Sequence, residues 1–198
     1  MRRSLLACGV LSCFLALASP SQAQIVNGGF ESPSSPVGYA LLGGGSTAIT
    51  GWVTTDNGVE WWSPSGYGPV PAGPNVVDLA CYTYSAGGIQ QTFATVPGQS
   101  YRIDYWLGTH AVSGRDGTAS IVVSADGQSQ TDTATSLTTN IGWFPKTFTF
   151  VADDATATLR FRCTQNANVH FAYVDGVGAS LVVPARETTW GRVKSLWR

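Results

Sequence analysis

The chain has 198 residues, of which 12% are charged and 11% are aromatic, and its formal net charge is −1. The charge is uneven, because residues 24–183 carry a net charge of −6 whereas residues 184–198 carry +3. A body this acidic argues against nucleic acid as the main partner.

Residues 1–23 have the pattern of a secretory signal peptide. Two arginines precede a short apolar run, and the small residues Ser21 and Ala23 occupy both cleavage positions. The apolar run is shorter than the roughly 20 residues that a membrane-spanning helix needs. We therefore expect a secreted, extracellular protein that is cleaved after Ala23 and has no transmembrane segment in the mature chain.

Residues 24–183 show recurring alternation of apolar and polar residues and no sustained helical periodicity. In segment 101–107, for example, Trp106 shares the polar face with Arg102 and Asp104. Ten strands are expected, at 25–31, 49–54, 57–62, 75–80, 87–95, 101–107, 119–125, 147–150, 157–163 and 172–182. Short strands without helices predict one all-β domain, an antiparallel β-sandwich or jelly roll.

Two segments rich in Ser, Pro and Gly, 32–47 and 63–74, are expected to be surface loops. The second is long and carries Tyr67, which is typical of the loops that hold function in a sandwich. Residues 184–198 form a basic C-terminal tail with two tryptophans. This tail is expected either to associate with the envelope as a sorting or docking segment, or to be a packed or disordered terminus.

Several short motifs occur in an order that resembles a known family. The first is Asn27-Gly28-Gly29-Phe30-Glu31 and the last is Val174-Asp175-Gly176-Val177, and between them lie 45–52, 58–61, 77–79, 87–93, 97–101 and 142–143. This pattern resembles the bacterial choice-of-anchor C family and is similar to plant cell-wall proteins of unknown function that have galactose-binding-like domains. The resemblance implies an extracellular, galactose-binding-like jelly roll, similar to carbohydrate-binding modules, that binds carbohydrate without established catalysis. Many members have a longer hydrophobic C-terminal anchor, which the basic tail replaces here.

The resemblance also implies a structural calcium ion. In similar jelly-roll modules, the glutamate after the first Gly-Phe and the acid of the last strand share an ion, and these positions correspond to Glu31 and Asp175. Calcium prefers carboxylate and carbonyl oxygens as ligands. The alternative is that both acids only accept backbone N–H bonds at a strand seam. Relatives often carry a second acid or amide where this chain has Gly176, so a second side-chain ligand is missing there.

Sugar binding needs flat aromatic side chains and a few polar groups that bond hydroxyls. The candidate ligand-binding residues are Trp62, Trp106, Tyr67, Tyr82, Tyr84, Asp78, Arg102, Arg160 and Arg162. For each candidate the alternative is a loop anchor or a solvated strand face. Trp52 and Trp143 are expected in the core, and of Trp61 and Trp62 one is expected in the core and the other exposed or in a groove.

The two cysteines that follow the signal sequence, Cys81 and Cys163, most simply form one disulfide in an exported protein. Two separately buried thiols are the alternative. Catalysis has little support, because no spaced pair of carboxylates is marked and the two histidines, His110 and His170, lack metal-ligand spacing.

The sequence therefore predicts a secreted, non-catalytic protein that binds a polysaccharide or glycan at the cell surface or in a matrix. Two alternatives stay open: a structural or adhesive surface protein docked by its tail, and a small glycan-active hydrolase.

Overall fold

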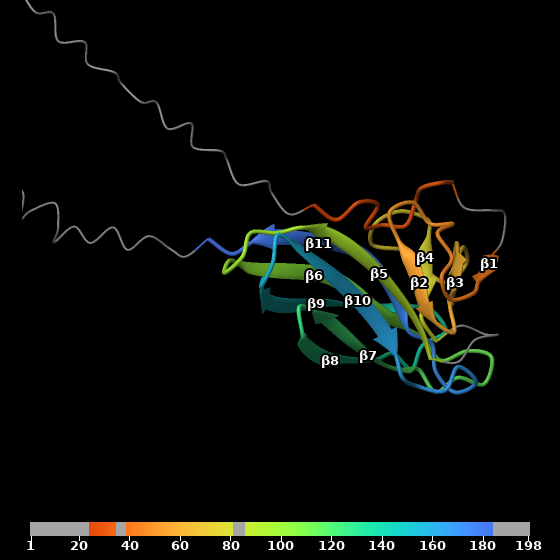
Figure 1. Ribbon diagram of the computed structural model, residues 1–198. Coiled ribbons are helices and arrows are strands. Elements are labelled where there is room, and N and C mark those ends of the chain that lie inside the picture. The colour runs from red at the N-terminus through yellow and green to blue at the C-terminus, as the bar shows by residue number, and fades with distance from the viewer. Residues whose placement is uncertain (1–23, 35–38, 81–85, 184–198) are drawn as a thin grey trace, which may run out of the picture.

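The structure is a computed structural model that describes residues 24–34, 39–80 and 86–183. These residues form two antiparallel β-sheets packed face to face, which confirms the predicted all-β sandwich (Figure 1). Within the described ranges there is no α-helix, and hence no helix long and apolar enough to cross a membrane. The predicted signal peptide and the basic tail lie outside the described residues.

The first sheet, sheet A, has the strand order β1-β3-β4-β11-β6-β9. Its strands are β1 (Tyr39–Leu42), β3 (Val59–Trp62), β4 (Val76–Asp78), β6 (Ser100–Thr109), β9 (Gly142–Val151) and β11 (Tyr173–Leu181). Sheet B has the order β2-β5-β10-β7-β8. Its strands are β2 (Val53–Asp56), β5 (Gly87–Ala94), β7 (Thr118–Ala125), β8 (Gln128–Thr135) and β10 (Thr156–Cys163).

The core between the sheets is built from the apolar residues that alternate along the strands. Ile103 of β6, for example, is fully buried, whereas its neighbour Arg102 is exposed. Trp52 packs against Phe30 and Phe161 in this core, as its position after a glycine predicted. Burial of such aromatic side chains is the main stabilising contribution in a fold of short strands.

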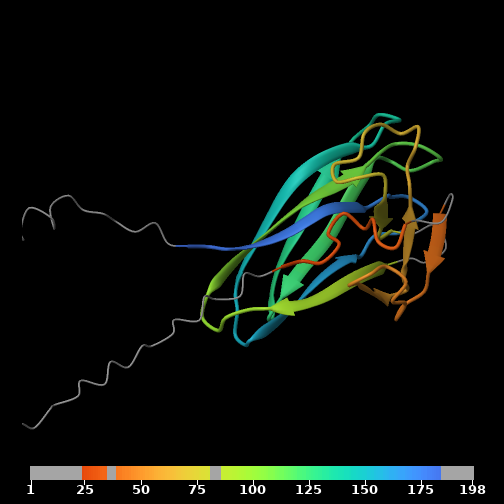
Figure 2. The same ribbon diagram turned by 90° about the horizontal axis from the view of Figure 1, so that it is seen from above.

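The N-terminal segment, residues 24–34, is irregular, so the predicted strand at 25–31 is wrong. Asn27 and Phe30 have positive φ angles, which lie outside the β region, and residues 24–34 form no strand. The segment is nevertheless fixed to the sandwich, because the Gly28 carbonyl accepts the N–H of Val177 in β11 at 2.9 Å. Figure 2 shows it running beside β11, and Phe30 is fully buried. The segment around Gly28 therefore contacts β11 without forming a β-ladder.

Two strands were not expected. β1 lies inside the segment 32–47, which was predicted to be a loop, and it is short and pairs only with β3 at the edge of sheet A. β8 follows the Asp126-Gly127 turn and pairs with β7 along its whole length. Ser, Thr and Gln fill most of β8, so the apolar alternation that reveals a half-buried strand is absent.

A β-bulge in β11 determines which of its side chains face the core and which face outward. The pairing register with β6 shifts between Asp175 and Gly178, and Gly176 has a φ of 60°. The extra residue lets Val174 and Val177 both face the core. Asp175 consequently lies on the opposite face of sheet A, toward the functional region described next.

Candidate functional site

The outer face of sheet A holds a pocket of about 250 Å³. Glu60 of β3 pairs with Asp78 of β4, and Asp78 pairs with Tyr173 of β11, so these three residues form one row across the sheet. The lining is mostly aromatic or ionisable: Tyr39, Glu60, Trp62, Tyr67, Asp78, His110, Val112, Ser113, Arg115, Phe171 and Tyr173. Aromatic rings with a few polar groups suit a small ligand that has both apolar faces and hydroxyl groups.

A strap, residues 63–74, bounds the pocket on one side. It leaves β3 after Trp62, and its Tyr67 carbonyl accepts the N–H of Ile141, just before β9, at 2.9 Å. On its return to β4, the N–H of Ala72 donates to Asp175 of β11 at 2.8 Å. The strap therefore reaches across the outer face of the sheet and is fixed at both of these points. The prediction of an irregular loop over 63–74 is confirmed, and its Tyr67 lines the pocket.

Tyr173 and His110 form the centre of the pocket wall. Nδ1 of His110 lies 3.0 Å from the Thr139 carbonyl, so it carries the proton, and Nε2 accepts the hydroxyl of Tyr173 at 3.0 Å. Burial lowers the pKa of His110 and raises that of Tyr173, which keeps the imidazole and the phenol neutral. Trp62 packs against both Tyr67 and Tyr173, at ring-centroid distances of 5.9 and 5.8 Å.

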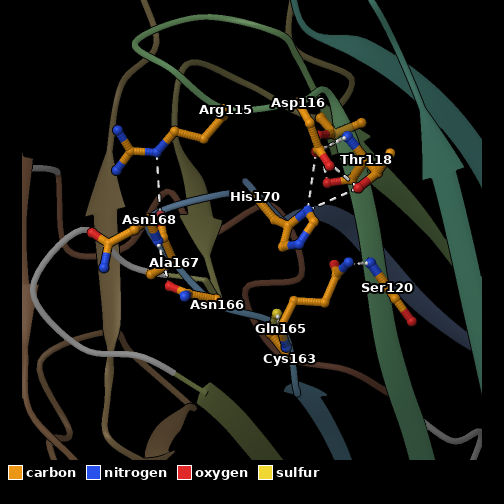
Figure 3. A network of polar contacts seen from close by, with 11 residues as sticks. Arg115, Asp116, Thr118, Ser120, Cys163, Gln165, Asn166, Ala167, Asn168 and His170 are labelled. Atoms are coloured by element: carbon orange, nitrogen blue, oxygen red, sulfur yellow. Dashed lines mark hydrogen bonds and ion pairs between the residues drawn. The ribbon is translucent and has the colours of Figure 1, made fainter.

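Two loops, 110–117 and 164–172, also contribute lining residues, and polar contacts hold them together (Figure 3). Nδ1 of His170 lies 3.0 Å from Asp116 and 2.8 Å from the Thr118 hydroxyl. Burial pushes the pKa of Asp116 upward, but the bonds from Thr118 and His170 outweigh it, so the pKa lies below its ordinary value. Arg115 donates to the Ala167 carbonyl, and its guanidinium lies 4.7 Å from the centroid of the Phe171 ring. These contacts position Phe171 and Arg115 at the pocket.

The structure brings together three of the predicted ligand-binding residues, Trp62, Tyr67 and Asp78. Asp78 is buried, and its Oδ1 accepts the N–H groups of Ala80 and Ala172. Much of its role is thus to fix the floor of the pocket. Tyr82 and Tyr84 lie outside the described residues.

Trp106 and Arg102 lie on the same outer face of sheet A but do not line the pocket. A side chain at Gly176 would meet both Trp106 and Ala72, so the strap comes down on β11 close to Trp106. Arg102 is bound to Asp104 at 2.8 Å at the exposed surface. The strap thus separates Trp106 from Trp62, which the sequence could not reveal.

Arg160 and Arg162 belong to β10 of sheet B and therefore lie away from the pocket. Both bind Asp56, at 2.7 and 3.1 Å. Burial raises the pKa of Asp56, but the bonds and charges of the two arginines and the Thr55 hydroxyl together lower it below its usual value. The prediction that these arginines face outward from a strand is confirmed. The prediction that they belong to one ligand-binding site with the aromatic residues of sheet A is wrong, because they lie on sheet B.

Trp143 was predicted to lie in the core, and this prediction is wrong. It is half-buried and packs at 6.3 Å from Tyr173 in a second apolar cluster, on the outer face of sheet A. His110, Phe171, Tyr173 and Arg115 are site residues that sequence reasoning missed. The only available signal was the alternation in β11, which places Tyr173 on the face opposite Val174.

Glu31 and Asp175 lie close enough for the charge of Glu31 to act on Asp175. Glu31 accepts the backbone and side-chain N–H groups of Asn75, both at 2.8 Å. Asp175 accepts the N–H groups of Ala72 and Gly176. Each carboxylate oxygen thus accepts one N–H, which agrees with the alternative that these acids only bind N–H groups. Each oxygen also keeps a further lone pair, which a cation would use. No cluster of three or more acidic, His or Cys side chains suited to a metal occurs within 24–34, 39–80 and 86–183.

Asp175 is fully buried, and burial raises its pKa to about 7, with a further upward contribution from Glu31. The N–H groups of Ala72 and Gly176 oppose that shift. A cation bound between the buried Asp175 and the partly exposed Glu31 would relieve the repulsion between their charges. These two carboxyl groups would supply only part of the roughly six to eight oxygens that calcium takes, and the ion stays a prediction.

Cys163 is fully buried at the end of β10, and its sulfur has no disulfide partner among the described residues. Burial raises its pKa to about 11, which disfavours the thiolate. Cys81 lies outside the described residues, and no disulfide is seen among the residues that are described. The bond between Cys81 and Cys163 stays a prediction.

Comparison with solved structures places this sandwich among carbohydrate-binding-module folds. TmCBM61, solved in complex with β-1,4-galactotriose, superimposes with a TM-score of 0.55 at 13% identity, over 82% of this chain and 100% of that one. The arabinose-bound MgGH51 α-L-arabinofuranosidase gives a TM-score of 0.52 at 11% identity, over 81% of this chain but only 26% of the enzyme. At these identities the likeness establishes the fold alone.

Residues 23–175 match the model of the DUF642 family, described as proteins of unknown function. The chain belongs to this family. No curated protein matches the chain.

Proposed function

We propose that this protein is a secreted, non-catalytic carbohydrate-binding β-sandwich that binds a polysaccharide or glycan at the cell surface or in the extracellular matrix. The observation that carries the proposal is the pocket on sheet A, where Trp62, Tyr67 and Phe171 surround the ionisable groups of Glu60 and Arg115. Aromatic rings contact the apolar faces of sugars, and the polar groups bond hydroxyls. The fold shared with carbohydrate-binding modules supports the same function.

The signal-peptide pattern and the resemblance to choice-of-anchor C and plant cell-wall proteins support the proposed extracellular setting. The acidic body disfavours nucleic acid as a partner.

A binding role is favoured over hydrolysis by the way the acids of the pocket are held. Glu60 and Asp78 are direct neighbours across β3 and β4, and a glycosidase also needs two carboxyl groups near each other. Asp78, however, is buried and bound by two backbone N–H groups, which commits it to the floor of the pocket. A catalytic acid or nucleophile must instead reach the glycosidic bond.

The test is retention of the secreted protein on insoluble polysaccharides and on a broad glycan array. Trp62→Ala should remove binding, because it deletes an aromatic surface worth about 1 to 3 kcal/mol. Trp62→Phe should keep most of it. Trp106→Ala is the matched control, an aromatic deletion on the same face beyond the strap, and it should bind normally. Failure of the protein on every glycan would contradict the proposal.

A further inference from the structure

We propose that the pocket takes a single residue at the end of a glycan chain, and that this residue is a neutral sugar. The inference rests on the proposed function and specifies its ligand. It follows from the walls of the pocket, from its volume and from the charges that line it.

The walls prevent a long chain from lying across the sheet. The strap closes one side, where Tyr67 is bonded to Ile141 and Ala72 to Asp175. The loops 110–117 and 164–172 close another side and are joined by the contact between Asp116 and His170 and by the bond from Arg115 to Ala167. A chain that passed from Trp62 to Trp106 would have to displace the strap.

The volume points to a small ligand. At about 250 Å³, the pocket falls below the roughly 300–1,000 Å³ of sites that hold drug-sized molecules. The rings at its centre are close-packed, with Phe171 stacked on Tyr173 at 5.4 Å and Tyr67 edge-on to His110 at 5.0 Å. Such a space admits one sugar ring and leaves the rest of the chain in solvent.

The charges disfavour an acidic sugar. Glu60 and Asp78 bring two carboxyl groups to the lining, whereas Arg115 brings one guanidinium and His110 is neutral. Arg115 also donates to the carbonyls of Ala167 and Ser113, so it lacks the open fork that binds a carboxylate in bidentate fashion. A uronic acid would therefore be repelled by Glu60 without a matching arginine clamp.

The experiment measures affinity along a series of defined ligands by titration calorimetry with the full mature protein. The probes are gluco-, galacto-, manno- and xylo-oligosaccharides from the monosaccharide to the hexasaccharide, together with the corresponding hexuronic acids. The expected result is a Kd for a neutral series that levels off by the disaccharide, with the matching uronic acid at least about fivefold weaker, as one unit charge at short range in water gives.

Two variants test the charge. Glu60→Gln should narrow the gap between the neutral and acidic probes, because it removes a charge from the pocket. Asp104→Asn removes the same charge from β6 beyond the strap and should leave the gap unchanged.

A Kd that improves with each added sugar, or tighter binding of the uronic acids, would overturn the inference while the carbohydrate-binding function stood. No binding of any oligosaccharide or parent polysaccharide would overturn both.

Discussion

Protonation of Asp175 is expected to control the stability of the sandwich. This carboxyl group is fully buried, and burial together with the charge of Glu31 raises its pKa to about 7 from the ordinary value of 3.8. The folded protein therefore holds a proton at Asp175 in a pH range where the unfolded chain has already released it.

The sign and size of the effect follow from this difference. Stability from the bound proton is fully present below the unfolded pKa and is lost as the pH rises through the folded pKa. The difference between 3.8 and about 7 corresponds to at most about 4 kcal/mol of unfolding free energy. For a domain of this size, the whole difference corresponds to a fall in Tm of roughly 10 °C, spread from a pH below the unfolded pKa to a pH above the folded pKa.

The assay is urea unfolding followed by tryptophan fluorescence, in EDTA, at several pH values from about 4 to about 8. Asp175→Asn is the comparison, because asparagine cannot titrate and keeps one acceptor for the N–H groups of Ala72 and Gly176. The stability of the wild type minus that of the variant should fall as the pH rises. Parallel curves for the two proteins would refute the reasoning.

The same measurement tests the proposed calcium site at Glu31 and Asp175. A cation bound to the ionised pair takes the place of the proton, so millimolar calcium at neutral pH should raise the Tm by several degrees and flatten the pH dependence. EDTA should reverse the gain, and Asp175→Asn should abolish the response. The same Tm in calcium and in EDTA would contradict the proposed calcium site.

Three further predictions concern the packing of the segments around the site. Gly28→Ala would place a Cβ 1.9 Å from the Val177 carbonyl oxygen and should lower the unfolding free energy, measured in urea, by about 1 to 3 kcal/mol. Gly178→Ala should lower it far less, because an added Cβ meets nothing there. Equal losses would contradict the close approach of Gly28 to Val177. Asp116→Asn should speed hydrogen exchange in loop 164–172 and weaken glycan binding a few-fold. It should change the unfolding free energy by less than about 1 kcal/mol. Unchanged hydrogen exchange in the loop would show that Asp116 does not hold it in place. Cys163, buried with a raised pKa, should resist iodoacetamide in the reduced native protein and react once urea unfolds it, so fast native labelling would show that it is accessible.

Much of the fold could be predicted from the sequence, because half-buried strands alternate. Apart from Trp106, the apolar residues of β6 and β10 lie on one face, and both strands were located within a residue or two. β8 was missed because its outward and inward residues are both mostly polar. The segment 25–31 was wrongly predicted to be a strand, since the positive φ angles at Asn27 and Phe30 leave no trace in an apolar pattern.

The site was only partly predictable, for a different reason. Trp62, Tyr67 and Asp78 stood out by residue type, and they lie within a short stretch of chain. His110 and Tyr173 meet across 63 positions of sequence, and their contact depends on the order of strands in sheet A. Spacing along the chain cannot show which distant strands become neighbours, so most of the residues that line the pocket could not be predicted.

The place of β11 in sheet A governs how the protein can be made. This last strand lies between β4 and β6, in the middle of the sheet, and supplies Val174 and Val177 to the core. During synthesis, the edges of β4 and β6 that pair with β11 therefore stay unpaired until Leu181 has been added. The sandwich closes only when translation of the body is complete, which leaves a long interval in which chaperones can hold the chain unfolded.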